Sequence, residues 1–319
     1  MRNLRLGIIG TGFITDTLCE AAGLVEGVEI SAVYSRKVDT GCAYAQKHGI
    51  KSYFTSLADM LDGDAVDAVY VASPTVCHYE HTLMAARAKK HILCEKSMSV
   101  SQEKTEEMIK VAREEGVILL EAMRPAFDPM VDAFKAQLAN IGKVRRFGFE
   151  FRKYSSRYDK FKAGIVENAF DPSLQNSALS DIGVYPLWLA TELFGVPKSL
   201  HHESVYLHNG FLAAGEIILG YSDTVGNISY SKITEGRQPS FVEGECGTVF
   251  IDKISEPQRV WCTDRDGKVL FELNGDCKNN MIYELIAFRD AVLSGERFEK
   301  ELSVSRSVAG IMDTITNKN

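Results

Sequence analysis

A glycine-rich turn near the start of the chain has a spacing suited to binding a phosphate. Gly10 and Gly12 fall in the pattern Gly-x-Gly-x-x-Thr, which ends at Thr15. Gly10 permits a tight turn, and Gly12 lets the backbone approach a pyrophosphate at a helix N-terminus. A tight strand-to-helix turn without a ligand is the alternative, but a turn in the first strand–helix unit favours the phosphate loop. The residues expected to contact a dinucleotide here are Gly10, Thr11, Gly12, Phe13 and Ile14.

The end of the second predicted strand indicates which dinucleotide binds. Proteins that bind NAD place Asp or Glu there to hydrogen-bond the ribose 2′-hydroxyl. This chain has Ser35, Arg36 and Lys37 at that point, and no acid before Asp39. A hydroxyl group and two cations suit a 2′-phosphate, and a guanidinium can also stack on adenine. We therefore expect NADP rather than NAD, with a solvated basic turn as the alternative.

Lys96 is the first candidate for a reacting centre. It follows Glu95 at the end of a predicted parallel strand, which is where open α/β sheets place their ligands. An ammonium at this point can hold a substrate oxygen whose charge changes during hydride transfer. The alternative is a solvated lysine on the surface.

Asp181 and Tyr185 are the second candidate pair. They are four residues apart in a helical pattern and therefore share one face. Tyrosine has an ordinary pKa of about 10 and exchanges protons poorly near neutrality. A nearby cation such as Lys96 would favour the phenolate and lower that pKa. The alternative is a core tyrosine capped by a carboxylate, and Pro186 is expected to kink the helix beside it.

Two kinds of sequence pattern position these candidates. Up to about residue 120, apolar runs alternate with helical stretches, which requires a parallel sheet covered on both faces. After Pro125, strand-like segments follow one another, with helical patterns at 178–194 and 280–293, which predicts an open, mainly antiparallel sheet with helices on one face. The predicted strands are 4–9, 30–34, 68–72, 91–94 and 117–120, then 144–153, 199–207, 212–220, 225–232, 247–251, 258–263 and 268–273.

Length and composition predict two domains in an ordinary globular chain. A chain of 319 residues allows two domains of about 150 residues each. The net charge of −7 argues against nucleic acid or an anionic membrane as the main partner. We expect an α/β, doubly wound Rossmann domain over residues 1–122 and an α+β domain for substrate binding and dimerisation over residues 123–319. The seven cysteines are odd in number and never form Cys-x-x-Cys, which favours the reducing cytoplasm.

Two further motifs are interpreted as structural. His78 and His81 follow Pro74 at a spacing of three, but no third ligand is suitably placed, so we expect a polar first turn of helix near the cofactor and no metal site. Tyr158 and Lys162 spell the Tyr-x-x-x-Lys pair of short-chain dehydrogenases. They lie in a charged stretch after the change of domain, and we expect them on the surface.

The order of these motifs resembles the Gfo/Idh/MocA family, which includes glucose–fructose oxidoreductase and inositol dehydrogenase. That family carries Glu-Lys-Pro where this chain has Glu-Lys-Ser at residues 95–97, and a preceding Pro-x-x-x-His segment, here Pro74 to His78. The resemblance continues in residues 121–123 and in the segment 180–186, which is similar to the family's Asp-x-Gly-x-His/Tyr motif. The Tyr form is similar to the branch of dihydrodiol dehydrogenases and NADP-dependent xylose dehydrogenases.

The resemblance implies an oxidoreductase that moves hydride between NADP(H) and a secondary alcohol or carbonyl carbon of a sugar, polyol or cyclic diol. Ser97 replaces the motif proline and residues 176–177 replace a common Gly-Gly, two departures that affect the substrate side. A non-catalytic regulatory protein that binds dinucleotide and sugar is the alternative, and turnover of NADP⁺ would distinguish the two. The implied catalytic residues are Lys96, Tyr185 and Asp181, and the implied further cofactor contacts are Ser73, Pro74, Thr75, His78, Glu95 and Lys96.

The second domain is also expected to form a homodimer, or a dimer of dimers. Two helical patterns can cover only one side of a sheet of this size, and a large bare apolar face is rarely left in water. An isologous two-fold contact is the commonest symmetry for such a face.

Overall fold

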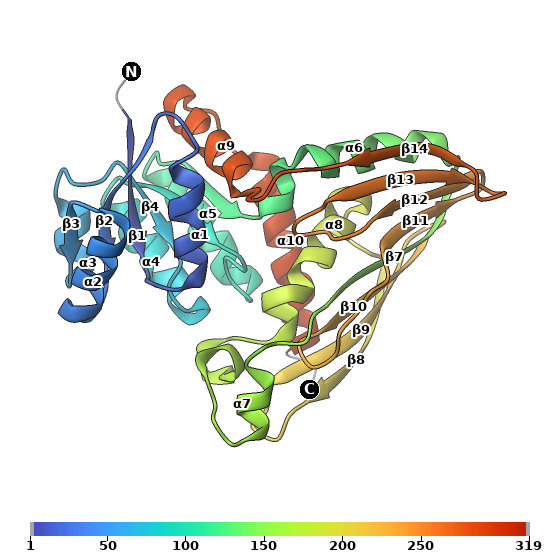
Figure 1. Cartoon of the computed structure of the whole chain (residues 1–319), viewed down its shortest axis with the longest axis horizontal. Coiled ribbons are helices and arrows are strands. Elements are labelled where there is room, and N and C mark those ends of the chain that lie inside the picture. Colours follow the sequence, from blue (N-terminus) through green and yellow to red (C-terminus); the bar gives the residue numbers. More distant parts are fainter. Residues whose placement is uncertain (1–2, 317–319) are drawn as a thin grey trace. The chain divides into compact units, whose positions relative to one another are not determined.

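The computed structural model describes residues 3–316, which form two compact units with one sheet each (Figure 1). The first unit contains the chain up to Met123 and a returning segment, Asn279–Ala309. The second unit contains Arg124–Lys278 and, within the described residues, the segment from Gly310 to Thr316. No sequence pattern pointed to this return, and the functional domains 1–122 and 123–319 stay a prediction.

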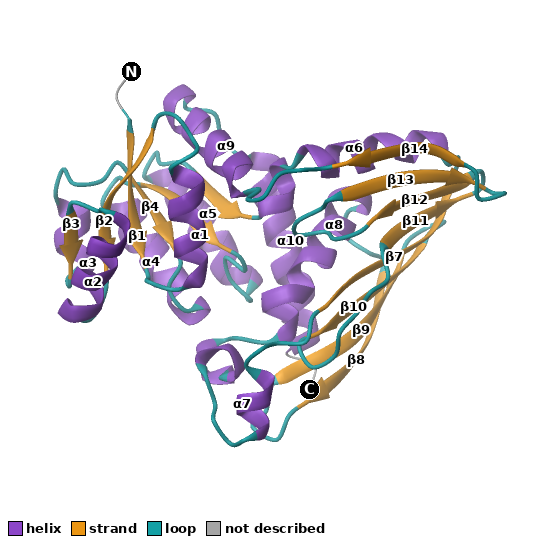
Figure 2. Ribbon diagram, viewed as in Figure 1, coloured by secondary structure: helices purple, strands orange, loops and turns teal. Residues whose placement is uncertain are grey.

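The first unit is a Rossmann fold, as predicted. Its six strands are all parallel, in the order β3-β2-β1-β4-β5-β6, and helices flank the sheet (Figure 2). The strands are β1 (Leu4–Ile9), β2 (Val28–Tyr34), β3 (Ser52–Phe54), β4 (Ala68–Val71), β5 (His91–Glu95) and β6 (Leu119–Ala122). The helices are α1 (Phe13–Ala22), α2 (Val38–His48), α3 (Leu57–Asp62), α4 (Thr75–Arg87), α5 (Gln102–Glu114) and α9 (Met281–Ser294).

The core of this unit explains why its strands are mostly apolar. Strands covered on both faces have no solvent side, and β4 is buried at all four positions. The last helix, α10 (Glu299–Thr316), contributes to the same core, because Leu302 packs in a cluster with Met108 and Ile109 of α5. The returning segment is therefore part of what stabilises the Rossmann unit.

The second unit is an open sheet of eight strands in the order β14-β13-β12-β11-β7-β10-β9-β8. All neighbours are antiparallel except β7 and β10, which confirms the mainly antiparallel prediction. The strands are β7 (Val144–Arg152), β8 (Ser199–Tyr206), β9 (Leu212–Gly220), β10 (Val225–Ser231), β11 (Ser240–Gly244), β12 (Gly247–Ile251), β13 (Arg259–Asp264) and β14 (Val269–Asn274). The helices are α6 (Pro129–Gln137), α7 (Tyr158–Lys162) and α8 (Val184–Phe194), with a π-helical segment at Leu179–Gly183.

Among residues 3–316, helices contact one face of this sheet, and the opposite face carries partly exposed side chains. Phe147 and Phe149 point from β7 into the core, where Phe147 stacks on Phe194 of α8 at 4.6 Å between ring centroids. The register places Gly148, Phe241, Phe250 and Trp261 opposite one another across four strands, and therefore on the opposite face. The helices α6 and α8 contact the strands from the Phe147 side.

Several elements were not predicted from the sequence. They are the short strands β3 and β11 and the helices α2, α6, α7 and α10. In α2, polar residues are interspersed with small apolar ones, and β3 and β11 are short for recognising alternation. Within residues 3–316, none of the helices combines the length and the apolar character that a bilayer crossing needs.

Candidate active site

The glycine-rich turn is built around a close backbone approach at Gly10. Its φ is +125°, and a Cβ at this position would lie 2.5 Å from the carbonyl oxygen of Ala72. The Gly10 N–H donates to the carbonyl oxygen of Tyr34 at 3.3 Å, so the turn touches the ends of both β2 and β4. A side chain at position 10 would separate these strand ends, and only glycine fits.

The space beside Gly12 has the character of a phosphate site. A Cβ built on Gly12 meets no atom within 4 Å, and Gly12 is the N-cap of α1, whose first backbone N–H groups have no partner within the helix. The ring of Phe13 is 79% exposed beside this turn. Thr15, the third position of the pattern, is buried, and its hydroxyl donates to Gly12 O at 2.7 Å and accepts from Tyr44. The loop therefore fits a dinucleotide pyrophosphate.

The basic segment Ser35–Lys37 joins β2 to α2 at the same edge of the sheet. The side chains of Arg36 and Lys37 are exposed, and Ser35 is tied to the sheet through its N–H, which donates to Phe54 O at 3.0 Å. The positive charge of Arg36 is one cause of the lowered pKa of His81, after burial, so the guanidinium lies within electrostatic reach of α4. The segment thus gathers cations next to the phosphate loop.

His78 links the end of β4 to the segment after β5. It is 2% exposed; its Nε2 lies 2.8 Å from Ser73 O and its Nδ1 lies 3.0 Å from Ser97 O. Burial lowers the pKa of His78 to about 4, so the imidazole is neutral at pH 7 and donates to one of the two carbonyl oxygens. Nearby, His81 Nδ1 lies 2.9 Å from Ser73 Oγ. Among the residues that the structure describes, no three potential ligands gather into a metal site.

Two buried carboxylates, those of Glu95 and Glu121, hold the backbone at and after Lys96. Its backbone N–H donates to Glu95 Oε2 at 3.1 Å, and the hydroxyl of Tyr70 donates to Glu95 Oε1. Glu121, at the end of the neighbouring strand β6, accepts from the N–H of Met98 at 2.7 Å. Burial raises the pKa of Glu121, although hydrogen bonds and the charge of Lys96 oppose the shift. The peptide bond between Lys96 and Ser97 is cis.

Asp181 lies in the second unit and is paired with a buried lysine. Lys232, which directly follows β10, donates to Asp181 Oδ2 at 2.7 Å. The Lys232 side chain is 6% exposed, whereas that of Asp181 is 42% exposed. The carboxylate is therefore anchored from the inside of the unit and reachable from solvent.

Tyr185 is the second residue of α8 and is 5% exposed. Its ring packs on Phe151 at 5.6 Å between centroids. A π-helical segment carries Asp181 and ends immediately before α8, in which Pro186 supplies no backbone N–H. The kink expected at Pro186 stays a prediction. Asp181 and Tyr185 belong to one continuous helical stretch of the second unit, and Lys96 belongs to the first unit.

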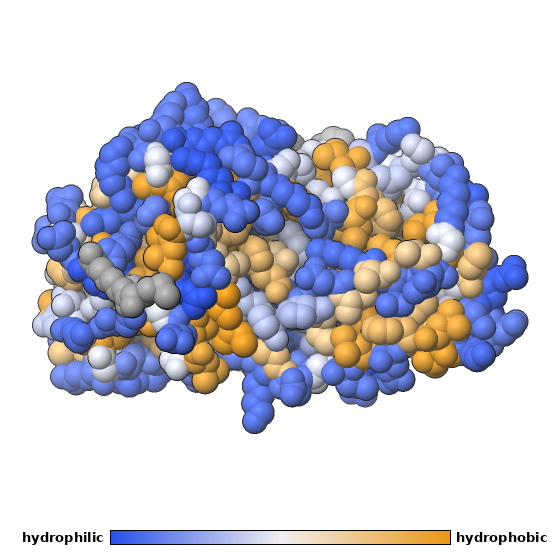
Figure 3. Space-filling view, turned by 90° about the horizontal axis from the view of Figure 1, so that it is seen from above, coloured by the Kyte–Doolittle hydropathy of each residue, from blue (hydrophilic) through white to orange (hydrophobic). Residues whose placement is uncertain are grey.

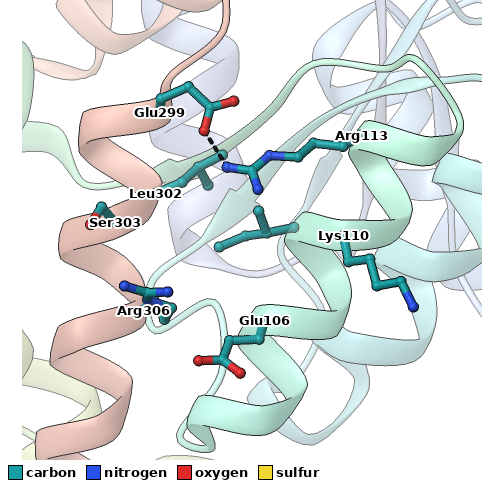
Figure 4. Close-up of a pocket in the computed structure, with 8 residues that line it drawn as sticks. Glu106, Lys110, Arg113, Glu299, Leu302, Ser303 and Arg306 are labelled. Atoms are coloured by element: carbon teal, nitrogen blue, oxygen red, sulfur yellow. Dashed lines mark hydrogen bonds and ion pairs between the residues drawn. The ribbon is translucent and has the colours of Figure 1, made fainter.

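Two features lie apart from these groups. A hollow of about 530 Å³ opens between α5 and α10, with an ion pair between Arg113 and Glu299 at one end (Figure 4). None of the candidate residues lines it. The Tyr-x-x-x-Lys pair forms α7, where the Lys162 side chain is 53% exposed and pairs with Asp159 at 2.7 Å.

Sequence reasoning missed Lys232, Glu121 as a support of residues 96–98, and Tyr70. In the sequence, Tyr70 is one residue of the apolar run that forms β4. Its contact with Glu95 depends on strand register, which no local pattern reveals. Lys232 ends an alternating strand, which offered a weak signal. A lysine at a strand end is usually solvated, so only the structure shows that this one is buried.

Comparisons with known proteins agree with this geometry. The Gfo/Idh/MocA family, described as an oxidoreductase family with an NAD-binding Rossmann fold, matches residues 4–123. The chain is 39% identical to scyllo-inositol 2-dehydrogenase (NADP⁺) IolU of Bacillus subtilis, over 96% of this chain and 93% of the relative. It is 26% identical to trans-1,2-dihydrobenzene-1,2-diol dehydrogenase of Mus musculus, over 92% of this chain and 89% of the relative.

The fold is shared with solved structures. A 3-ketoreductase from Actinomadura kijaniata, crystallised with NADP and TDP-benzene, superposes with a TM-score of 0.86 at 24% identity, covering 98% of this chain and 97% of the other. Levoglucosan dehydrogenase, crystallised with NADH and levoglucosan, superposes with a TM-score of 0.88 at 18% identity, covering 99% and 96%. These likenesses show the same two-domain architecture.

The buried neutral state of His78 predicts a pH dependence of stability. An unfolded histidine, with a pKa of about 6.5, takes up a proton as the pH falls, whereas His78 in the folded chain stays neutral to about pH 4. The folded state therefore loses up to about 3 kcal/mol of stability between these two pH values. Urea unfolding at pH 7 and pH 4.5 should show this loss in the wild type and a smaller one in His78→Gln. The control is His201→Gln, which changes an exposed histidine on β8. Equal pH slopes for wild type and His78→Gln would contradict the assignment.

Proposed function

The chain belongs to the Gfo/Idh/MocA family of oxidoreductases, and we propose that it is an NADP(H)-dependent dehydrogenase acting on a ring hydroxyl group of a polyol or sugar. The observation that carries the proposal is the sheet edge at Gly10, where an open phosphate loop adjoins Ser35, Arg36 and Lys37. The 39% identity to an NADP⁺-dependent inositol dehydrogenase over nearly the whole chain supports the same cofactor.

The residues that would hold NADP(H) all lie at this edge of the first unit. The turn from Gly10 to Ile14 would hold the pyrophosphate, and Arg36 with Ser35 and Lys37 would hold the 2′-phosphate. Ser73, Pro74 and Thr75, at the start of α4, would contact the remainder together with His78, Glu95 and Lys96. When bound, NADP⁺ accepts a hydride from the carbon that bears the reacting hydroxyl group.

Proton transfer is the part of the reaction that this chain must supply. Oxidation of an alcohol removes the hydroxyl proton as the carbonyl forms, so a base must lie within hydrogen-bond reach of that oxygen. We assign this role to Tyr185, and to Lys96 the task of holding the substrate oxygen whose charge changes during hydride transfer. Asp181, whose carboxylate is reachable from solvent, orients neighbouring hydroxyl groups of the substrate. A substrate with several hydroxyl groups on one ring suits this arrangement.

Cyclic polyols are the first substrates to test. Purified protein should reduce NADP⁺ with at least one member of a panel of inositols, aldoses and trans-dihydrodiols, followed by absorbance at 340 nm. The inositols lead the panel because of the inositol dehydrogenase relative. No turnover with any member, in either direction, together with tight binding of NADP⁺, would favour a regulatory protein instead.

Arg36 should set the preference for NADP(H). Arg36→Ala removes a charge-assisted hydrogen bond to the 2′-phosphate and should weaken NADP⁺ binding by about 1.5–3 kcal/mol, with little change for NAD⁺. Fluorescence titration with both cofactors measures this. A matched control is Arg265→Ala, which removes an exposed arginine in the turn after β13. The assignment fails if both cofactors lose affinity equally, or if the wild type prefers NAD⁺.

Tyr185 should carry the proton. Tyr185→Phe keeps the ring packed on Phe151 and should lower kcat by ~10²–10⁴, the usual range for a lost acid–base group, with NADP⁺ affinity nearly unchanged. Lys96→Met should be at least as damaging and should also flatten the alkaline rise of the pH–rate profile. Steady-state kinetics on a substrate whose hydride step is rate-limiting measures these changes in kcat and in the pH–rate profile. A Tyr185→Phe enzyme with more than about a tenth of wild-type turnover would point to Lys96 as the proton carrier.

The uncovered sheet face should form a homodimer. Phe250 and Trp261 stack on it at 4.9 Å, and Ile218 is 49% exposed on the same face. Figure 3 shows hydrophobic and hydrophilic side chains interspersed over the face of the molecule seen from above. Light scattering should show a dimer for the wild type and a particle of 35.4 kDa for Trp261→Glu. Lys268→Glu, which changes an exposed turn, should stay dimeric. A wild-type particle of 35.4 kDa at micromolar concentration would refute the dimer.

A further inference from the structure

Lys232 is a lysine buried in the second unit with two polar partners. Its ammonium donates to Asp181 Oδ2 at 2.7 Å and to the carbonyl oxygen of Ala169 at 3.0 Å, and its side chain is 6% exposed. Lysine is almost never fully buried unless it is paired, because moving an ammonium out of water is costly. Both partners lie in segments distant in sequence from β10, so the ammonium joins three separate parts of the unit.

Two aromatic rings fix the position of this ammonium. The Lys232 Nζ lies 5.2 Å from the ring centroid of Phe170 and 5.6 Å from that of Phe211, within the range of cation–π attraction. Phe170 and Phe211 are both 0% exposed, and their rings pack against each other in a tilted arrangement with centroids 4.8 Å apart. The surroundings of Lys232 are therefore rigid, and the ammonium offers Asp181 a donor in one fixed direction.

The loop that faces Asp181 across Lys232 is held at three successive carbonyl groups. Asn176 Nδ2 donates to Asn168 O at 2.7 Å, Lys232 donates to Ala169 O, and Asn209 Nδ2 donates to Phe170 O at 2.8 Å. Of these donors, Lys232 also binds the candidate substrate-orienting carboxylate, that of Asp181. It thus couples the shape of the loop at residues 168–170 to the direction of Asp181.

The helix that carries Asp181 begins with a reciprocal serine cap. The N–H of Ser177 donates to Ser180 Oγ at 3.1 Å, and the N–H of Ser180 donates to Ser177 Oγ at 2.9 Å. The Asp181 N–H donates to Ser177 O at 3.0 Å. The backbone at Asp181 is therefore set by the cap, and the remaining freedom of the carboxylate is in its side-chain torsions, which the Lys232 ion pair restricts.

We propose that Lys232 is a positioning residue that aims the Asp181 carboxylate at the substrate's hydroxyl groups and thereby determines affinity for polyhydroxylated substrates. The proposal rests on the proposed function, because Asp181 must be the group that orients the substrate. An aspartate that holds hydroxyl groups binds substrate and transition state alike, so losing its direction raises KM and leaves kcat almost unchanged. This signature differs from the one expected of the proton carrier.

Lys162 provides a matched control within the same unit. It too pairs with a carboxylate, that of Asp159 at 2.7 Å, and lies over two rings, those of Tyr154 and Tyr158, at 5.6 and 5.3 Å. Its side chain is 53% exposed, and neither partner is a candidate site residue. Lys162→Met therefore removes the same chemical group without touching Asp181.

The kinetic test compares Lys232→Met, Lys232→Arg and Lys162→Met in the full-length protein, with the best polyol of the substrate panel and saturating NADP⁺. Lys232→Met should raise KM for the polyol at least tenfold with kcat within about threefold, Lys232→Arg should restore most of the affinity, and Lys162→Met should match the wild type.

In an Asp181→Asn background, Lys232→Met should change kcat/KM by less than about threefold, because its effect acts through Asp181. Full additivity of the two substitutions, or a fall in kcat at unchanged KM, would overturn the proposal.

Hydrogen exchange tests the same role without any substrate. Amides in peptides that cover residues 164–181 should exchange faster in Lys232→Met than in the wild type, and unchanged in Lys162→Met. Unchanged exchange in Lys232→Met would overturn the proposal. If the wild type turns over no member of the panel, the proposed function fails, and the role of Lys232 in holding Asp181 is decided by the exchange result alone.

Discussion

The close approach of Gly10 to the end of β4 is the constraint on which the first unit's site depends. With a Cβ position only 2.5 Å from Ala72 O, residue 10 must be glycine, and its φ of +125° turns the chain from β1 into α1 within a few residues. Because parallel strands end at one edge, this turn brings the basic segment after β2 and the start of α4 next to the N-terminus of α1. The phosphate loop, the cations and the segment at Lys96 are gathered by sheet topology.

Buried polar groups then fix the reacting segments more finely. In the first unit, His78 contacts Ser97 O and Glu121 binds Met98 N–H, so the backbone after Lys96 is held from two sides. In the second unit, Lys232 performs the equivalent task for Asp181. In both places, a titratable side chain taken out of water stabilises one particular geometry, since breaking it would leave a buried group without its partner. The two units, which have different folds, thus both use a buried titratable side chain to fix the geometry of a candidate site residue.

Local sequence patterns were sufficient to predict the strands and helices that recur along the chain and the turns between them. Alternation of apolar runs and helices predicted the Rossmann unit, and successive alternating strands predicted the open sheet, because these patterns report burial directly. The return of residues 279–309 to the first unit could not be predicted, although the buried positions of α10 recur at helical spacing, at 302, 304, 305, 308, 309, 311, 312 and 315. The contacts that Tyr70, Glu121 and Lys232 make to support the site depend on register and tertiary structure, for which local patterns give at most a weak signal.

The central claim, that this chain moves a hydride between a polyol carbon and NADP(H), is tested most directly by following the hydrogen itself. The protein would be incubated with NADP⁺ and an inositol deuterated at its ring carbons, and the reduced cofactor would be examined by NMR. The account predicts deuterium at C4 of the nicotinamide, on one face only, and a primary isotope effect when hydride transfer limits the rate. Reduced cofactor without deuterium, or a deuterated substrate returned unchanged by a protein that binds NADP⁺ tightly, would contradict it.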